Sequence, residues 1–184
     1  MTSLKGNFLI ASNSLADPNF VRTVLLMVEH SETGAAGVIL NRPTGATIAE
    51  ISRKVFNEPD DWDKPIFLGG PVPGPLMVLH AVEEFSDQSV VEGLYTTIDP
   101  DKIQELIQQR VEPSMFLANY AGWGAGQLEL ELAQDSWRVI PADRDLALAG
   151  GDDSLWETLM RRVSANLLAG ALGLPDLPND PSLN

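Results

Sequence analysis

The feature that most constrains this sequence is a pair of apolar segments separated by a short polar turn. Residues 21–30, VRTVLLMVEH, are rich in β-branched and apolar side chains and have no polar face at helical spacing, which predicts a buried strand. The polar stretch SETG follows, and residues 35–41, AAGVILN, predict a second strand. Together they predict a β-hairpin, with Gly34 marking the turn and Gly37 a bulge.

Strands outnumber helices along the rest of the chain. Short apolar runs bounded by Gly, Pro and polar clusters predict further strands. These runs lie at 6–11, at the start of 66–75, at 76–82, 90–98 and 136–141, and in SMFLANYA, which leads into a glycine-rich stretch. Because the strands do not alternate strictly with helices, the pattern predicts an α+β fold rather than a doubly wound α/β sheet.

Three helices are predicted from apolar spacing and capping residues. Thr47 is the expected N-cap of a helix over 47–56, and Asp99 followed by Pro100 begins a second helix. The capping-box pair Ser154 and Glu157 begins the last helix. No linker divides the chain, so residues 1–172 are expected to form one domain, followed by a Pro-rich tail at 173–184.

Composition excludes several classes of function. The 184 residues include no Cys, and 12 basic against 26 acidic residues give a formal net charge of −14. The lack of Cys excludes disulfides, thiolate metal ligands and a Cys nucleophile. The acid excess argues against direct binding of nucleic acid or of an anionic membrane surface. No apolar run approaches the roughly 20 residues of a membrane helix, and no secretory signal is recognisable, so a cytoplasmic protein is expected.

The chain shows little local evidence of catalytic or metal chemistry. His30 and His80 are the two histidines, and neither has a second His two to five residues further on, so no metal site and no cofactor is predicted. No G-x-S-x-G motif is present, and no nucleophile is assigned. Arg42 is expected to form an ion pair with a nearby carboxylate, because acidic residues are in excess.

The stretch NYAGWGAGQLELEL, residues 119–132, allows two interpretations. A Walker loop needs Lys and Ser or Thr after its last glycine, and none follows Gly126; the glycine spacing is also one residue short of a dinucleotide fingerprint. A tight strand-to-helix corner is favoured over an anion-binding loop, because Glu129 and Glu131 already complement the helix dipole. GGPVPGP, residues 69–75, is equally consistent with a stiff ligand-binding loop and with a crossing between strands.

Several of these segments together resemble the YqgE/AlgH family of bacterial proteins. The resemblance is carried by GNFLIAS, DPNFVRTVLLMVEH, GAAGVILNRP, FLGGPV and YAGWGAGQLELEL, in this order. It implies a single α+β domain with a bifurcated mixed sheet, a small barrel-like part and surrounding helices. The family carries a transcriptional-regulator label without a DNA-binding motif. Asn119 stands where the family pattern leads us to expect glycine.

The loops NRP, GGPV and AGWGAGQ are predicted to converge into a shallow polar cleft. The candidate ligand-binding residues are Asn41, Arg42, Gly69, Gly70, His80, Gly122, Trp123, Gly124, Gln127 and Glu131. Because no general base is paired with a nucleophile in sequence, the pattern favours a non-enzymatic binding or regulatory module that acts through a protein partner or a small molecule. The alternatives are an enzyme such as a hydrolase, with a polar cleft around His80, and a DNA-binding transcriptional regulator.

Overall fold

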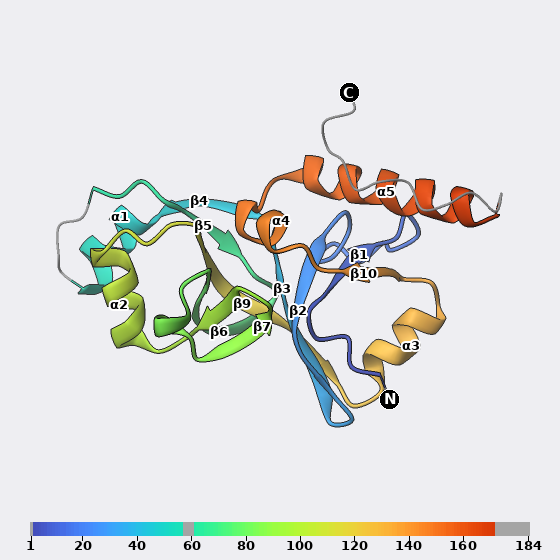
Figure 1. Cartoon of the computed structure of the whole chain (residues 1–184), viewed down its shortest axis with the longest axis horizontal. Helices are drawn as coiled ribbons and strands as arrows, with labels where there is room; N and C mark the ends of the chain where they lie inside the picture. The colour runs from blue at the N-terminus through green and yellow to red at the C-terminus, as the bar shows by residue number, and fades with distance from the viewer. Residues whose placement is uncertain (1, 57–60, 172–184) are drawn as a thin grey trace.

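The computed structural model describes residues 2–56 and 61–171, which form one α+β domain (Figure 1). The strands are β1 (Asn7–Ala11), β2 (Val24–Ser31), β3 (Gly34–Ile39), β4 (Pro43–Thr47), β5 (Pro65–Leu68), β6 (Val72–His80), β7 (Gln88–Val91), β8 (Leu94–Thr97), β9 (Ser114–Gly124) and β10 (Trp137–Pro141). The helices are α1 (Ile48–Ile51), α2 (Pro100–Gln108), α3 (Gln127–Ala133), α4 (Arg144–Ala149) and α5 (Asp153–Ala171), with a π-helical turn η1 (Ser52–Phe56) and a 3₁₀ turn η2 (Glu83–Phe85).

The strands form one mixed sheet that divides at β9. The order along the main path is β10-β1-β2-β3-β9-β6-β8-β7, and β5 lies off this path, parallel to β9 and antiparallel to β4. The first part of β9 pairs with β5 through Phe116 and Ala118, whereas its last part pairs with β3 through Ala121 and Gly124. Strands β3 and β5 therefore occupy the same edge of β9 at different heights, which confirms the bifurcated mixed sheet.

Gly69 joins the two branches at the point where they separate. Its amide donates to the carbonyl of Ala118 on β9 over 2.7 Å, and its carbonyl accepts from the amide of Ile39 on β3 over 2.8 Å. Gly70 follows so close to β9 that an added Cβ would lie 2.1 Å from the carbonyl carbon of Tyr120. Close backbone approach, rather than a ligand, accounts for the two consecutive glycines.

Asn119 lies at the same branch point in the left-handed backbone region, with a φ of 66°. Few residues other than glycine adopt this conformation, and Asn is the most tolerant of them. Its side-chain oxygen also accepts from the amide of Gly74 over 3.3 Å. Glycine is expected at this position because the backbone there needs a positive φ, and Asn119 can also adopt it.

The sheet curls so that its far strand approaches its beginning. The side-chain amide of Gln88 on β7 donates to the carbonyl of Val28 on β2 over 3.3 Å, and a Cβ on Gly6 would lie 2.7 Å from a methyl of Val91. The interior of this curl is a cluster of apolar side chains that includes Phe8, Leu26, Leu79, Leu94 and Leu117. The barrel-like part expected from the family resemblance is thus present as a half-barrel.

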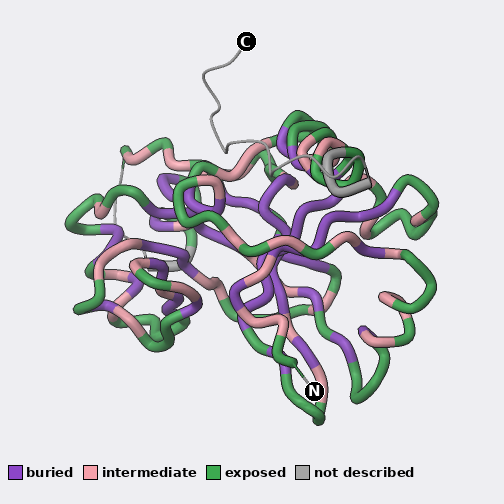
Figure 2. The backbone as a smooth tube through the Cα atoms, turned by 45° about the vertical axis from the view of Figure 1, so that its right-hand side comes forward, coloured by how far each residue is buried: buried purple, intermediate pink, exposed green. Residues whose placement is uncertain are grey.

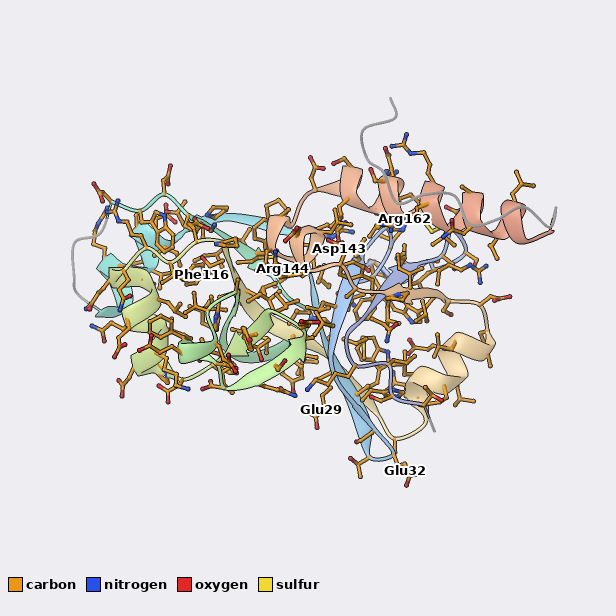
Figure 3. All side chains as sticks on the ribbon, viewed as in Figure 1. Glu29, Glu32, Phe116, Asp143, Arg144 and Arg162 are labelled. Carbon is orange, nitrogen blue, oxygen red and sulfur yellow. The ribbon has the colours of Figure 1, made fainter. Side chains whose placement is uncertain are left out.

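Helices cover the faces that the curl leaves open. In Figure 1, α1 and α2 lie at one end of the domain, and α3 and α5 lie at the other. Ile103 and Leu106 of α2 pack with Phe116 of β9, labelled in Figure 3, in a second apolar cluster that is distinct from the interior of the curl. Figure 2 shows the buried backbone concentrated in the strands and the exposed backbone in helix faces and loop tips, including the β2–β3 turn.

The structure confirms several predicted elements. The β2–β3 hairpin is present, but its bulge lies in β2 at Val28, between the pairs Met27–Gly37 and Glu29–Ala36, and not at Gly37 as predicted. Asp99 is the N-cap of α2, because its carboxylate accepts from the amides of Asp101 and Lys102 over 2.9 and 3.3 Å. Among the described residues, no helix has the combined length and apolar character needed to span a bilayer.

Other predicted boundaries are wrong for identifiable reasons. The single strand expected at 90–98 is a hairpin of β7 and β8, because Gly93 adopts a φ of 70° at the turn. Strand β6 begins before the expected 76–82, and it keeps Pro73 and Pro75 within its first residues. The helix expected over 47–56 is α-helical over only four residues and then continues as η1.

The beginning of α5 also differs from the prediction. The amide of Ser154 donates to the Asp152 carboxylate over 2.9 Å, so Asp152 rather than Ser154 supplies the cap. Helix α4 was not anticipated, and it begins where the Asp143 carboxylate accepts from the amide of Leu146 over 2.9 Å. The tail predicted at 173–184 lies outside the described residues.

The contact at the branch point leads to a stability prediction. We expect Gly70→Ala to lower the free energy of unfolding by about 1–3 kcal/mol, because the new methyl group meets backbone atoms that cannot rotate away. Gly124→Ala is the matched control, since its Cβ would find its nearest neighbour, the Gln127 side chain, at 4.0 Å. Urea denaturation measures both, and equal stabilities would contradict the role of Gly70.

Candidate functional site

Asn41 organises the part of the candidate site that lies at the end of β3. Its side chain is buried, and its oxygen accepts from the amide of Val24 over 2.9 Å. Its amide group donates to the carbonyl of Arg22, also over 2.9 Å. An amide side chain is suited to this position because it both accepts and donates. Asn41 thereby fixes the start of β2 against the end of β3 and holds Arg22 in place, where its φ is 55°.

Arg42 follows and turns its guanidinium toward the start of α5. Nη1 lies 2.9 Å from a carboxylate oxygen of Asp153 and 3.4 Å from the carbonyl of Asn41, while Nη2 donates to the carbonyl of Val21. The ion pair predicted for Arg42 is therefore confirmed, and Asp153 is its partner. The two backbone carbonyls hold the guanidinium independently of the carboxylate.

Arg22 brings a second positive charge to the same carboxylate. Its Nε lies 3.6 Å from Asp153, and its Nη2 pairs with Glu157 one turn further along α5. The guanidinium also lies over the ring of Trp156, 4.8 Å from its centroid, which adds a cation–π contact. Two arginines from different segments of the chain thus meet at the first turn of one helix.

An open cleft of about 420 Å³ lies between these groups. Its lining residues are Asn41, Arg42, Pro43, Asp152, Asp153 and Ser154. Hydrogen bonds from Ser154, its hydroxyl first, lower the pKa of the Asp152 carboxyl below its usual range. The cleft therefore presents one guanidinium and two carboxylates to solvent, and Asp153 also faces the guanidinium of Arg22.

The GGPV loop lies beside this cleft, and its glycines serve the sheet. The amide of Leu68 donates to the carbonyl of Arg42 over 2.7 Å, which places the loop next to NRP. Gly69 and Gly70 themselves pack against β9 at the branch point. Two of the three predicted loops therefore converge, and the glycines of the second support the cleft without lining it.

The third loop, AGWGAGQ, forms the corner between β9 and α3. Gly126, with a φ of 74°, ends the turn from β9 into α3. The side-chain oxygen of Gln127 accepts from the amide of Gly124 over 3.1 Å, and its amide donates to Glu131 over 3.0 Å. Gly122 leaves space for the ring of Tyr120, because a Cβ on Gly122 would lie 3.2 Å from a ring carbon of Tyr120.

Glu131 is the centre of this corner. One of its carboxylate oxygens accepts from the indole N–H of Trp123 over 2.9 Å and from that of Trp137 over 2.8 Å. Both indoles are buried, and Phe20 packs against them at centroid distances of 6.2 and 5.6 Å. The polar groups of the motif therefore satisfy one another, which supports the strand-to-helix corner over an anion-binding loop.

His80 does not line the cleft, and its expected place on the cleft wall is wrong. The side chain is fully buried on the face of β6 covered by α2, opposite Ser114 of β9 and stacked on Tyr95 at 6.1 Å. Within the described part of the chain, neither ring nitrogen has a hydrogen-bond partner, nor does the Ser114 hydroxyl. Burial lowers the pKa of His80 below its ordinary 6.5. The backbone of Val82, which lies near the ring without meeting hydrogen-bond geometry, opposes this shift, as does Asp87, whereas Lys102 lowers the pKa to a smaller extent.

His30 is occupied at both ring nitrogens. Nδ1 accepts from the amide of Leu4 over 2.9 Å, so Nε2 carries the proton and donates to Glu129 over 2.8 Å. This histidine ties the N-terminal segment and α3 to β2. Across residues 2–56 and 61–171, no group of three or more His, Asp or Glu side chains is placed to hold a metal ion.

Sequence reasoning did not assign Asp152, Asp153 or Ser154 to the site. They lie more than 100 residues after Arg42, and the folded chain brings α5 back over the start of β2. One sequence feature could have identified them. Asp152 and Asp153 precede a predicted helix, and Arg42 was expected to form an ion pair with a carboxylate.

The fold and site define an α+β domain with a forked sheet and a charged cleft beside the fork. The chain belongs to the AlgH-like family, whose model matches residues 8–168. It is similar to a UPF0301 protein from Thioalkalivibrio sulfidiphilus, with 35% identity over 94% of this chain and 97% of the relative. A UPF0301 protein from Myxococcus xanthus is 36% identical over 90% of this chain and 94% of its own length.

Solved structures show the same architecture. The solution structure of the AlgH protein from Pseudomonas aeruginosa matches with a TM-score of 0.75 and 33% identity, covering 96% of this chain and 97% of that one. A crystal structure of a protein from Corynebacterium diphtheriae matches with a TM-score of 0.71 over 88% of this chain and 87% of that one. At 24% identity, the second match supports the fold alone.

The shared carboxylate at the AGWGAGQ corner is testable by mutation. We expect Glu131→Ala to lower the free energy of unfolding by about 1–3 kcal/mol, because two buried indole N–H groups lose their acceptor. Glu131→Gln retains one acceptor oxygen, so its loss should be smaller. Chemical denaturation followed by tryptophan fluorescence gives both values, and an unchanged Glu131→Ala protein would contradict the proposed role.

Burial of His80 predicts a pH-dependent stability. Because the folded pKa is lowered, unfolded chains take up the proton first, so stability is fully present above pH 6.5 and falls as the pH drops from 6.5 toward the folded pKa. The slope from this one proton is at most about 1.4 kcal/mol per pH unit. His80→Leu should remove this component. Denaturant titrations between pH 7.5 and 5 test it, and parallel profiles for both proteins would contradict it.

Proposed function

We propose that this protein is a cytoplasmic, non-enzymatic binding module and that the cleft between NRP and the start of α5 is its ligand site. The observation that carries the proposal is the geometry of that cleft. An open volume of about 420 Å³ is bordered by Arg42, Asp152 and Asp153, beside a rigid branch point of the sheet. Ligand sites combine such a hollow with a few fixed polar groups.

The ion pair between Arg42 and Asp153 is weak enough for a ligand to replace one of its members. The side chains of Arg42 and Asp153 are 28% and 55% exposed, and ion pairs with this exposure contribute only about 0–1 kcal/mol. A ligand can therefore replace one partner of the pair at small energetic cost. Arg22 also keeps a left-handed backbone, a feature concentrated at functional sites, and Asn41 maintains it.

The alternative functions have less support. A hydrolase that uses His80 as general base needs substrate access to an imidazole that is fully buried beneath α2. A regulator that contacts DNA directly needs a basic surface, whereas the chain carries a net charge of −14. Regulation through a small ligand, or through a protein partner that reads the liganded state, is compatible with both observations.

A thermal-shift screen against a panel of metabolites and nucleotides tests the proposal. A ligand at about 100 times its dissociation constant adds roughly 2.7 kcal/mol, equivalent to about 5–10 °C for a chain of this size. We expect the shift to be lost in Arg42→Ala and retained in Arg144→Ala, which removes the same charge from an exposed pair with Asp145 on α4. A ligand that stabilises all three proteins equally would refute the cleft as its site.

A further inference from the structure

The structure also indicates the chemical class of the ligand, an inference that rests on the proposed function of the cleft. We propose that the cleft recognises an anionic group, a carboxylate or a phosphate carried by a small molecule, which replaces Asp153 between Arg42 and Arg22. In the described structure, the Asp153 carboxylate occupies the position that the ligand anion would take, 2.9 Å from Arg42 and 3.6 Å from Arg22.

The two guanidinium groups are held in place without Asp153. Arg42 donates to the backbone carbonyls of Asn41 and Val21. Arg22 rests on the indole of Trp156, with its Nη2 on Glu157. Removal of Asp153 therefore leaves Nη1 of Arg42 and Nε of Arg22 facing the same point. Guanidinium N–H groups form charge-assisted hydrogen bonds with carboxylate and phosphate oxygens.

Asp153 is the movable member of the cluster. Its side chain is more exposed than that of either arginine, at 55% against 28% for Arg42 and 41% for Arg22. Its carboxylate accepts a hydrogen bond from Arg42, whereas the carboxylate of the neighbouring Asp152 accepts from the backbone amide of Ser154. Rotation of the Asp153 side chain into solvent therefore exposes both arginines without disturbing the helix cap.

The surrounding charges limit the size of the anion. Asp152 and Glu157 remain beside the arginines after Asp153 turns away, so two positive charges face two negative ones. A polyanion such as a nucleic-acid backbone is repelled by this ring and by the charge of the whole chain. One compact anionic group between the two guanidinium groups fits, and the cleft volume of about 420 Å³ leaves room for the rest of a small molecule.

An NMR titration of the full chain at constant ionic strength tests the inference. The probes are inorganic phosphate and succinate as anions and putrescine as a cation. We expect the anions to shift the amide signals of Arg42, Asp153 and Ser154. Asp153→Asn removes the internal competitor, so it should strengthen anion binding by about two- to fivefold. Arg42→Met should weaken binding at least tenfold.

Asp145→Asn is the matched control, because it removes the same charge from a carboxylate that is 79% exposed and paired with Arg144 outside the cleft. Equal gains in Asp153→Asn and Asp145→Asn would reduce the effect to net charge and overturn the inference. Cleft shifts with putrescine and none with the anions would overturn the anionic class while retaining the cleft as a binding site. A cleft that responds neither to these three probes nor to the ligand panel would overturn both proposals.

Circular dichroism establishes that each variant is folded. Asp153→Asn alters an exposed side chain, so it keeps the test valid if Arg42→Met fails to fold. A phosphate effect without a succinate effect assigns the site to phosphate, and the reverse assigns it to carboxylate; both results support the anionic class.

Discussion

The structure depends on the close backbone contact at the fork of the sheet. Gly69 hydrogen-bonds to β9 on one side and to β3 on the other, and Gly70 leaves no space for a side chain against Tyr120. Without this contact, β5 and β3 would have to separate, and the end of β3 would lose its fixed position. The NRP segment begins at that end, so the geometry of the charged cleft follows from a constraint on backbone packing.

The polar residues near the fork divide into two kinds. Asn41, Glu131 and His30 hold parts of the fold together, since their hydrogen-bonding atoms are occupied by backbone groups, indoles or another side chain. Arg42 and Arg22 differ, because part of their interaction is with an exposed carboxylate. Ligand recognition requires polar groups that are held in a fixed position and can still form hydrogen bonds with a ligand. In this region, Arg22 and Arg42 are such groups, because a ligand can replace their exposed carboxylate partner.

The sequence predicts local features well and spatial convergence poorly. The β2–β3 hairpin, the Asp99 cap and the strand-to-helix corner at Gly126 are set by residues close together in the chain, so patterns and caps identify them. The family resemblance adds the forked sheet and the curl. The cleft depends on α5 returning to β2 and β3 across more than 100 residues, and no local pattern reports such a contact. His80 shows the opposite error, because a polar residue at a strand end can still be covered by a helix such as α2.

The stacking of Arg22 on Trp156 has a spectroscopic consequence. Trp156 also donates its indole N–H to the carbonyl of Ala11 over 2.8 Å, so the ring is fixed on one side and faces a guanidinium on the other. An indole in such a position changes its emission when the charge above it moves or is neutralised. Phe20, two residues before Arg22, lies against Trp123 and Trp137. Three of the four tryptophans therefore lie against the segment that carries Arg22. The intrinsic tryptophan fluorescence of the protein should therefore change when the position or charge of Arg22 changes.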